Sequence, residues 1–313
     1  MTVCIIILIL AALIALVSYA VSYIGFHSPN GRQNDDENIT RSDQMDPLRD
    51  TILAMIRALN ARPFERVYIT SRDGLRLAGR YYHQADGAPL DICFHGWRGT
   101  PSRDFSGGAG IYFAAGHNVL MVEERAQCSS EGHWMTMGVK ERLDCVDWVR
   151  YAVERFGADS RILVNGISMG AATVLMAAPD LPANVRGIVA DCPYTSPAEI
   201  VRKVLGDMRF SPAVFYPFMA LGARLFARFD LNAPGAVDAV RKTSVPILLI
   251  HGEDDRFVPC DMGRAIAAAN PAVELHTFPG AGHGLSFLLD EERYRAIVTD
   301  FADRVLAEQG IEV

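Results

Sequence analysis

The sequence predicts an α/β protein built on a mostly parallel sheet with helices on both faces. From residue 90 onward, short runs rich in Ile, Leu and Val alternate with helix-like segments, which is the order that strand–helix–strand units produce. These runs are apolar almost without interruption, as is typical of strands buried on both faces. The chain has 313 residues, of which 50% are hydrophobic, so one large domain of this class can bury its core.

The chain opens with an apolar segment that precedes this domain. Val3 to Ile24 is an uncharged apolar run, and about 20 apolar residues in a helix cross the hydrocarbon core of a bilayer. A signal peptide is the alternative, but it usually carries basic residues before a shorter apolar core, and no Lys or Arg precedes this run. We therefore expect residues 1–26 to be a single-pass transmembrane anchor, with secretion after signal-peptide cleavage as the alternative.

A polar stretch follows the apolar run. Residues 27–46 read HSPNGRQNDDENITRSDQMD, a composition that buries little apolar surface. We expect this stretch to be a tether that leads into an α/β domain over residues 47–313. The pair Asp46-Pro47 opens an amphipathic helix at about Leu48–Leu59.

The remaining elements follow in order along the domain. Two antiparallel strands, Glu65–Thr70 and Leu75–Tyr82, flank a turn that contains Gly74. The later strands are expected at Leu90–Phe94, Asn118–Val122, Arg161–Asn165, Gly187–Ala190, Ile247–Ile250 and Val273–Phe278, and the helices at Lys140–Arg155, Ala171–Ala178, Met262–Ala269 and Glu292–Leu306.

One interval, about residues 194–234, is too long for a single connecting helix. It is rich in Phe, Tyr, Pro and Met, with helices expected near Ala198–Leu205 and Ala213–Phe229. Long insertions between core elements often cover binding sites. We predict a small helical lid here, with additional helical packing as the alternative.

The turn Gly166-Ile167-Ser168-Met169-Gly170 connects a predicted strand to a predicted helix. In this context a Gly-x-Ser-x-Gly turn holds the serine in a strained conformation at the end of the strand. Small residues flank the serine because strand and helix approach closely there. Ser168 is therefore the candidate nucleophile.

A serine hydroxyl needs a neighbouring base, and in enzymes with this turn the chain order is Ser, then Asp or Glu, then His. His283 fits this order, because it lies in the loop GAGHG between the last strand and the last helix. The candidate acids are Glu253, Asp254 and Asp255, which follow the C-terminal end of a strand, and Asp191 is a rival. Spacing alone leaves these four carboxylates open.

Backbone N–H groups supply the predicted oxyanion hole. Acyl transfer places negative charge on the carbonyl oxygen, and preorganised donors stabilise it. One donor is the residue after the nucleophile, Met169, and the other comes from the loop after an earlier strand, where Trp97 follows His95-Gly96. His95 is expected to shape this loop, because the chain order excludes it as the base.

From Glu65 to about Gln309 the chain resembles the α/β-hydrolase superfamily, on the motifs HGWRGT, GISMG, ADCPYTS, HGEDDRFVP and GAGH. It is similar to bacterial membrane-anchored hydrolases and, more distantly, to the dipeptidyl-aminopeptidase/acylaminoacyl-peptidase and cephalosporin-C deacetylase branches. In such proteins the D of H-G-x-x-D-x-x-V-P is the acid, so the resemblance implies Asp255. One loop departs from the relatives' D-x-R-x-x-G-x-S, because Glu123 replaces the first Asp and Cys128 the Gly.

The resemblance implies a serine hydrolase with a Ser168–His283–Asp255 triad that cleaves a small-molecule ester, without a metal or cofactor. An amide or peptide hydrolase of the aminopeptidase type is one alternative, and a non-catalytic membrane-tethered binding protein is another. The net charge of -7 speaks against a nucleic-acid partner, since such binders usually have a basic face. The six cysteines show no metal-ligand spacing and are expected to be reduced and mostly buried.

Overall fold

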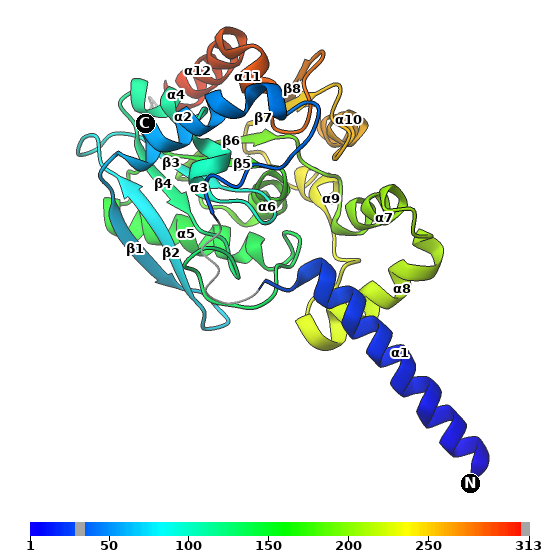
Figure 1. Cartoon of the computed structure of the whole chain (residues 1–313). Coiled ribbons are helices and arrows are strands. Elements are labelled where there is room, and N and C mark those ends of the chain that lie inside the picture. The colour runs from blue at the N-terminus through cyan, green and yellow to red at the C-terminus, as the bar shows by residue number, and fades with distance from the viewer. Residues whose placement is uncertain (29–34, 308–313) are drawn as a thin grey trace.

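The computed structural model describes residues 1–28 and 35–307 and is centred on an eight-stranded sheet (Figure 1). The strands are β1 (Glu65–Thr70), β2 (Arg76–Tyr82), β3 (Leu90–Phe94), β4 (Asn118–Val122), β5 (Ile162–Ile167), β6 (Val185–Asp191), β7 (Ile247–Gly252) and β8 (Val273–Phe278). They lie in the order β1-β2-β4-β3-β5-β6-β7-β8. The pairs β1–β2 and β2–β4 are antiparallel and the other pairs are parallel. The predicted fold class is confirmed.

Helices cover both faces of the sheet (Figure 1). One face carries α5 (Glu141–Phe156), α6 (Met169–Ala177), α9 (Ala236–Val240) and α10 (Cys260–Ala269); the other carries α2 (Arg49–Asn60), α3 (Pro101–Phe105), α4 (Ala109–Ala114), α11 (Ser286–Leu289) and α12 (Glu291–Ala307). Short 3-10 turns lie at Asp46–Leu48 and Ala178–Asp180.

The central strands contribute side chains to both layers of the core. In β4, Leu120 packs into the core on the α5/α6 side and its neighbour Met121 packs into the core on the α4/α12 side. Successive residues of a strand point to opposite faces, so a strand covered on both sides must be apolar at every position. This explains the uninterrupted apolar runs in the sequence.

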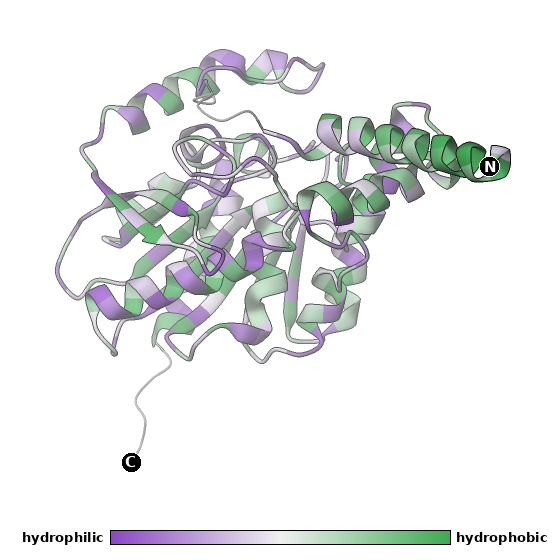
Figure 2. Ribbon diagram, turned by 90° about the horizontal axis from the view of Figure 1, so that it is seen from below, coloured by the Kyte–Doolittle hydropathy of each residue, from purple (hydrophilic) through white to green (hydrophobic). Residues whose placement is uncertain are grey.

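The N-terminal helix α1 (Thr2–Phe26) projects from the domain (Figure 1) and is apolar along its length (Figure 2). Its last turns pack on α8 (Pro212–Gly222) and on the π-helical turn η3 (Ala223–Ala227). The Ser22 hydroxyl donates a hydrogen bond to the carbonyl of Met219 at 3.2 Å. A Cβ on Gly222 would overlap the Ser18 carbonyl, so only glycine permits this close approach. Phe26 is buried against the ring of Phe229.

The insertion at residues 194–234 is helical, as the sequence predicts. It contains α7 (Pro197–Asp207), α8 and η3. These helices share an apolar cluster with Phe26 of α1 and with Met169 at the start of α6. The insertion therefore joins α1 to the sheet-bearing part of the domain.

The structure differs from the expected tether. Of residues 27–46, positions 29–34 lie outside the described part of the chain, and residues 35–46, here called the N-terminal strap, pack along the domain. Ile39 is buried against Ile52 and Ile56 of α2. The reason is that two apolar residues, Ile39 and Met45, and several ion pairs hold the strap, although its composition is polar.

Ion pairs attach the N-terminal strap at both ends. Glu37 forms two hydrogen bonds with the Arg57 guanidinium, at 2.8 and 2.9 Å. Asp43 pairs with Arg256 at 2.9 Å. The strap therefore runs from α2 to the loop that follows β7.

Candidate active site

Ser168 lies at a sharp turn between β5 and α6. Its backbone has φ 56° and ψ -113°, a region that is strained for a residue other than glycine. A Cβ on Gly166 would overlap the backbone of Gly170, and one on Gly170 would overlap the carbonyl of Phe94 in β3. The Ser168 N–H donates to the carbonyl of Asp191 in β6 at 2.8 Å. These contacts hold Ser168 at the C-terminal edge of the sheet.

Two loops at the same edge bring His283 and Asp255 to Ser168. Asp255 follows β7 and His283 follows β8, which are parallel neighbours in the sheet. His283 Nε2 lies 2.9 Å from Ser168 Oγ, and His283 Nδ1 lies 2.7 Å from Asp255 Oδ2. The ring of Phe257 packs edge-to-face on the imidazole, with centroids 5.1 Å apart. The structure thus places the three predicted residues in one hydrogen-bonded chain.

The Asp255 carboxylate is enclosed, with no exposed side-chain surface. Its Oδ1 accepts hydrogen bonds from the N–H groups of Phe257 at 2.9 Å and Val258 at 2.8 Å. Burial alone would raise the pKa of Asp255, but the hydrogen bonds from His251, His283 and Val258 hold this pKa well below its usual range. Asp255 is therefore an anion at neutral pH, the form that orients a histidine and stabilises its imidazolium.

The three other carboxylates considered from the sequence point elsewhere. Glu253 accepts from a threonine hydroxyl of β8 at 2.7 Å, and Asp254 is exposed. Asp191 accepts from a tyrosine hydroxyl of α12 at 3.0 Å. Burial raises the pKa of Asp191 to about 6. Of the four, Asp255 is the one that contacts His283.

The loop after β3 passes directly beside Ser168. A Cβ on Gly96 would lie 3.4 Å from Ser168 Cβ, and the Gly96 N–H donates to Asp104 Oδ2 at 2.7 Å. His95 is buried, with Nδ1 2.9 Å from the Gly96 carbonyl and Nε2 3.1 Å from the Glu124 N–H. His95 accordingly joins this loop to the end of β4 and does not contact the nucleophile.

The two predicted oxyanion donors, the N–H groups of Trp97 and Met169, belong to the two backbone segments beside Ser168. Trp97 belongs to the loop after β3, and Met169 is the first residue of α6. The first N–H groups of a helix have no partner within it, so the Met169 N–H points out of α6 at its Ser168 end. The two side chains share one apolar cluster, which holds the two backbone segments together.

A cavity of about 730 Å³ opens at Ser168 and His283. This volume is typical of small-ligand sites. Apolar and aromatic side chains make up much of its wall, among them Trp97, Phe105 and Phe287. The site can therefore enclose an uncharged group next to the nucleophile.

The N-terminal strap forms one wall of this cavity. Seven of its residues line the cavity, namely Asn38, Ile39, Thr40, Ser42, Asp43, Gln44 and Met45. The Gln44 amide donates to the carbonyl of Asp254 at 3.3 Å and packs on Gly282. In contrast, none of the described residues of the predicted lid, 194–234, lines the cavity. The cover that the sequence led us to expect from the insertion is provided here by the strap. Its two apolar residues, Ile39 and Met45, are the signal that the sequence offered for this.

Comparison with known proteins identifies the family. A sequence profile of the prolyl oligopeptidase family matches residues 113–309. The chain belongs to the prolyl oligopeptidase family. The matched segment includes Ser168, Asp255 and His283, and family and fold together confirm the resemblance to the α/β-hydrolase superfamily.

Individual relatives of this family member are distant. An uncharacterized protein of Bacillus subtilis is 22% identical over 62% of this chain and 65% of its own length, so the chain spans just under two thirds of that relative. A bifunctional esterase/perhydrolase of Acinetobacter calcoaceticus is 24% identical over 70% of this chain and 93% of its own. The solved structure of a Pyrococcus furiosus esterase has a TM-score of 0.63 and 22% identity, over 85% of this chain and 95% of that chain. Family membership and fold support a hydrolase.

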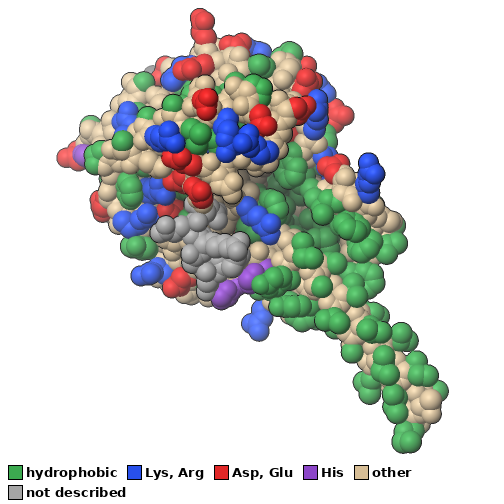
Figure 3. All heavy atoms as spheres, in the orientation of Figure 1, with side chains coloured by type: hydrophobic (Ala, Val, Ile, Leu, Met, Phe, Trp, Pro, Cys, Tyr) green, Lys and Arg blue, Asp and Glu red, His purple; other side chains and the backbone are tan. Residues whose placement is uncertain are grey.

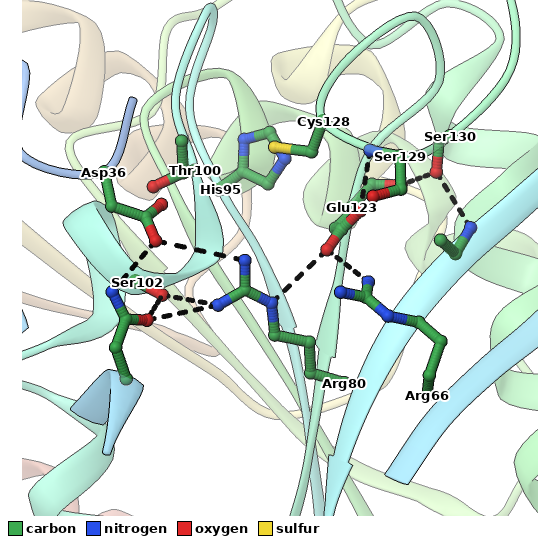
Figure 4. Close-up of polar contacts among 12 residues, drawn as sticks. Asp36, Arg66, Arg80, His95, Thr100, Ser102, Glu123, Cys128, Ser129 and Ser130 are labelled. Atoms are coloured by element: carbon green, nitrogen blue, oxygen red, sulfur yellow. Dashed lines mark hydrogen bonds and ion pairs between the residues drawn. The ribbon is translucent and has the colours of Figure 1, made fainter. Parts of the chain in front are cut away.

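In this member of the prolyl oligopeptidase family, Glu123 organises the loop after β4 (Figure 4). Its side chain is 1% exposed and pairs with Arg66 and, at 3.3 Å, with Arg80. Burial would raise the pKa of Glu123, but the two guanidinium groups and the Ser129 N–H hold it below its usual value. Arg80 also lies 4.0 Å from Asp36. The residue that departs from the relatives' pattern therefore connects this loop to the N-terminal strap.

One group of potential metal ligands lies in the site among the residues described. The ligand atoms of Cys192, Asp255 and His283 are all within 4.8 Å of one another. Asp255 and His283 already share their hydrogen bond, and burial raises the pKa of the Cys192 thiol well above its usual value. Because metals bind the thiolate, this donor set suits hydrogen bonding better than metal binding.

Proposed function

We propose that this chain is a serine hydrolase that cleaves a carboxylic ester of a small molecule through an acyl-enzyme on Ser168. The observation that carries the proposal is the hydrogen-bonded chain from Ser168 through His283 to Asp255 at the cavity. His283 Nε2 takes the hydroxyl proton as Ser168 Oγ attacks the ester carbonyl. Asp255 stabilises the imidazolium.

The remaining steps use the same groups. The N–H groups of Trp97 and Met169 bind the oxyanion of the tetrahedral intermediate, and His283 gives its proton to the leaving alcohol. His283 then takes a proton from a water molecule that attacks the acyl carbonyl, and returns it to Ser168 as the free acid leaves. The reaction is a hydrolysis and consumes one water.

Two observations favour an ester over an amide. The cavity wall is rich in apolar side chains, which suit an uncharged acyl or alkyl group. An esterase is also among the similar structures, and an esterase/perhydrolase is among the relatives. The prolyl oligopeptidase family match supports an amide or peptide bond as the second candidate substrate, and the same residues would serve that reaction.

A fluorophosphonate probe tests the nucleophile in the full-length protein. We expect an adduct on Ser168, mapped by mass spectrometry, and no adduct in Ser168→Ala or His283→Ala. Ser106→Ala is the matched control, because Ser106 also lines the cavity but its hydroxyl contacts the carbonyl of Arg103. A folded wild-type protein without an adduct would contradict the proposal and favour the non-catalytic binding protein.

Substrate panels separate the two bond types. We expect the wild type to hydrolyse p-nitrophenyl esters and Ser168→Ala to lose this activity. Hydrolysis of aminoacyl p-nitroanilides without ester hydrolysis would instead assign the peptidase reaction.

We also propose that α1 is an uncleaved membrane anchor. It is 25 residues long and apolar, and it is the one helix among the described residues that could span a bilayer. Its last turns are part of the domain, since Phe26 is 2% exposed and Arg98 donates to the carbonyl of Ile24 at 2.9 Å. Removal of a signal peptide there would strip these contacts, which favours retention of the helix.

A further inference from the structure

Helix α8 is apolar on both of its faces. Tyr216 and Met219 are buried in the cluster shared with α1. On the other side, Val214 is 54% and Leu221 37% exposed, and Leu225 in η3 follows at 54%. Positions three, four and seven apart share one face of a helix, so these side chains form a continuous exposed row. A surface helix in water presents polar side chains on such a face.

This row belongs to a larger concentration of apolar side chains. Beyond residue 26 the described residues include ten exposed large hydrophobic side chains, and six of them lie between residues 208 and 226: Met208, Phe210, Val214, Leu221, Leu225 and Phe226. We call these six residues the apolar patch. No charged residue occurs from Phe210 to Ala223. Figure 3 shows hydrophobic side chains continuing from α1 onto the adjoining domain surface, whereas acidic and basic side chains cover the upper part of this face.

The end of the apolar patch formed by Leu221, Leu225 and Phe226 lies at the level where a bilayer around α1 would end. Crossing a hydrocarbon core of about 30 Å takes about 20 helical residues, which from Val3 extends to Ser22. At this level the Phe226 ring packs edge-to-face on Tyr19, with centroids 5.1 Å apart, and Gly222 lies against Ser22. A bilayer that covers α1 as far as Ser22 therefore also meets η3 and the adjoining end of α8.

We propose that the apolar patch is a second membrane-contacting surface, which enters the boundary between headgroups and acyl chains beside α1. The inference rests on the proposed anchor role of α1. Interfacial helices bury their apolar face about 5–10 Å into this boundary. Arg209, Arg224 and Arg228 border the patch and are exposed, so their long side chains can reach lipid phosphates. Lipid is the occupant favoured here because the patch is continuous with α1.

Two membrane contacts fix the orientation of the domain. A single helix would leave the tilt of the domain against the bilayer free, whereas the apolar patch restrains this tilt. Arg98 lines the cavity and also contacts Ile24 of α1, so the cavity edge is held near the lipid surface. This placement suits an amphipathic ester that partitions into the headgroup region.

Spin-label accessibility in bilayers tests the proposal with the full-length chain. Cys4→Ser removes the exposed cysteine, and Leu225→Cys, Leu289→Cys and Leu10→Cys are labelled separately in phosphatidylcholine–phosphatidylglycerol vesicles. Leu289 is the matched control, because it is 52% exposed and lies on α11, far from α1 (Figure 1). The parent without an added cysteine gives the background signal. Collision rates with oxygen, which dissolves in lipid, and with a water-soluble nickel complex report the surroundings of each label.

We expect labels at residues 10 and 225 to favour oxygen several-fold more than the label at residue 289. A label at residue 225 that collides freely with the nickel complex, while the label at residue 10 is in lipid, would overturn the patch proposal and leave the anchor intact. A label at residue 225 that neither reagent reaches would also overturn it, and would indicate a protein partner or a second copy. If the label at residue 10 meets the nickel complex, the anchor proposal itself fails, and with it the inference.

Discussion

Asp255 differs from its neighbours in the donors that surround it. Its carboxylate accepts hydrogen bonds from two backbone N–H groups and from His283, whereas Asp254 is exposed to solvent. We expect Asp255→Asn to lower kcat/KM for an ester by roughly 10³–10⁴-fold, because a neutral amide cannot stabilise the imidazolium or fix its tautomer. Steady-state kinetics with Asp254→Asn as the control, expected to be unchanged, would check this. A loss under tenfold would remove Asp255 from the acid role.

Asp191 gives a pH-dependent prediction of a different kind. Burial raises its pKa to about 6, above the ordinary value of about 3.9 in an unfolded chain. The folded state therefore favours the protonated acid. The contribution of protonated Asp191 to the free energy of unfolding is largest at low pH and is lost as the pH rises through 6. Between pH 4 and 7 the free energy of unfolding of the wild type should fall by about 2 kcal/mol relative to Asp191→Asn. Denaturant titrations at several pH values measure this difference, and parallel curves for the two proteins would refute it.

At the residue scale, the sequence indicated which loops form the site, but it did not by itself indicate which of three adjacent carboxylates contacts His283. Ser168 and His283 follow from a turn motif and from chain order. The choice of Asp255 over Glu253 and Asp254 needed a family resemblance, because all three belong to one loop. What separates them is the backbone turn that aims the Phe257 and Val258 N–H groups inward, a geometry that composition and spacing do not encode.

At the level of elements, the N-terminal strap is the feature that shapes the cavity. Ile39 is 4% exposed and fastens the strap to α2, so Ile39→Ala should lower the free energy of unfolding by about 2–4 kcal/mol. Because the strap lines the cavity, the ratio of kcat/KM between short-chain and long-chain p-nitrophenyl esters should also change several-fold.

The control for this variant separates stability from selectivity. Ile266→Ala deletes the same atoms from a fully buried position of α10, away from the cavity. It should cost a similar free energy of unfolding and leave the ester selectivity unchanged. Equal changes of selectivity in both variants would show that the strap has no specific role.

The strap shows where composition misleads. The length and polarity of residues 27–46 predicted a tether because a polar stretch buries little apolar surface. Besides its apolar contacts with α2, the strap is held by charged residues whose partners, Arg80 and Arg256, lie far along the chain. The strands and most helices were predictable because hydrophobic periodicity is local, whereas these pairings are not.

At the scale of the whole molecule, the anchor has a direct test. We expect the full-length protein to remain in the membrane pellet after alkaline carbonate washing, with peptides from residues 1–26 present by mass spectrometry. The physical reason is that an apolar helix of this length is stable in the bilayer and its last turns are packed into the domain. A soluble mature protein that begins after residue 26 would establish the signal-peptide alternative.

The path of the N-terminal strap has a consequence for how this enzyme behaves once it is detached. The chain leaves α1 and soon afterwards supplies seven residues of the cavity wall, so the proposed anchor and the proposed substrate site are joined by one short stretch of polypeptide. Proteolytic shedding after residue 46 would release more than a soluble copy of the same catalyst. On the function and anchor proposed above, it would remove that wall, open Ser168 to bulkier compounds, and turn a membrane-bound hydrolase into a soluble and more permissive one.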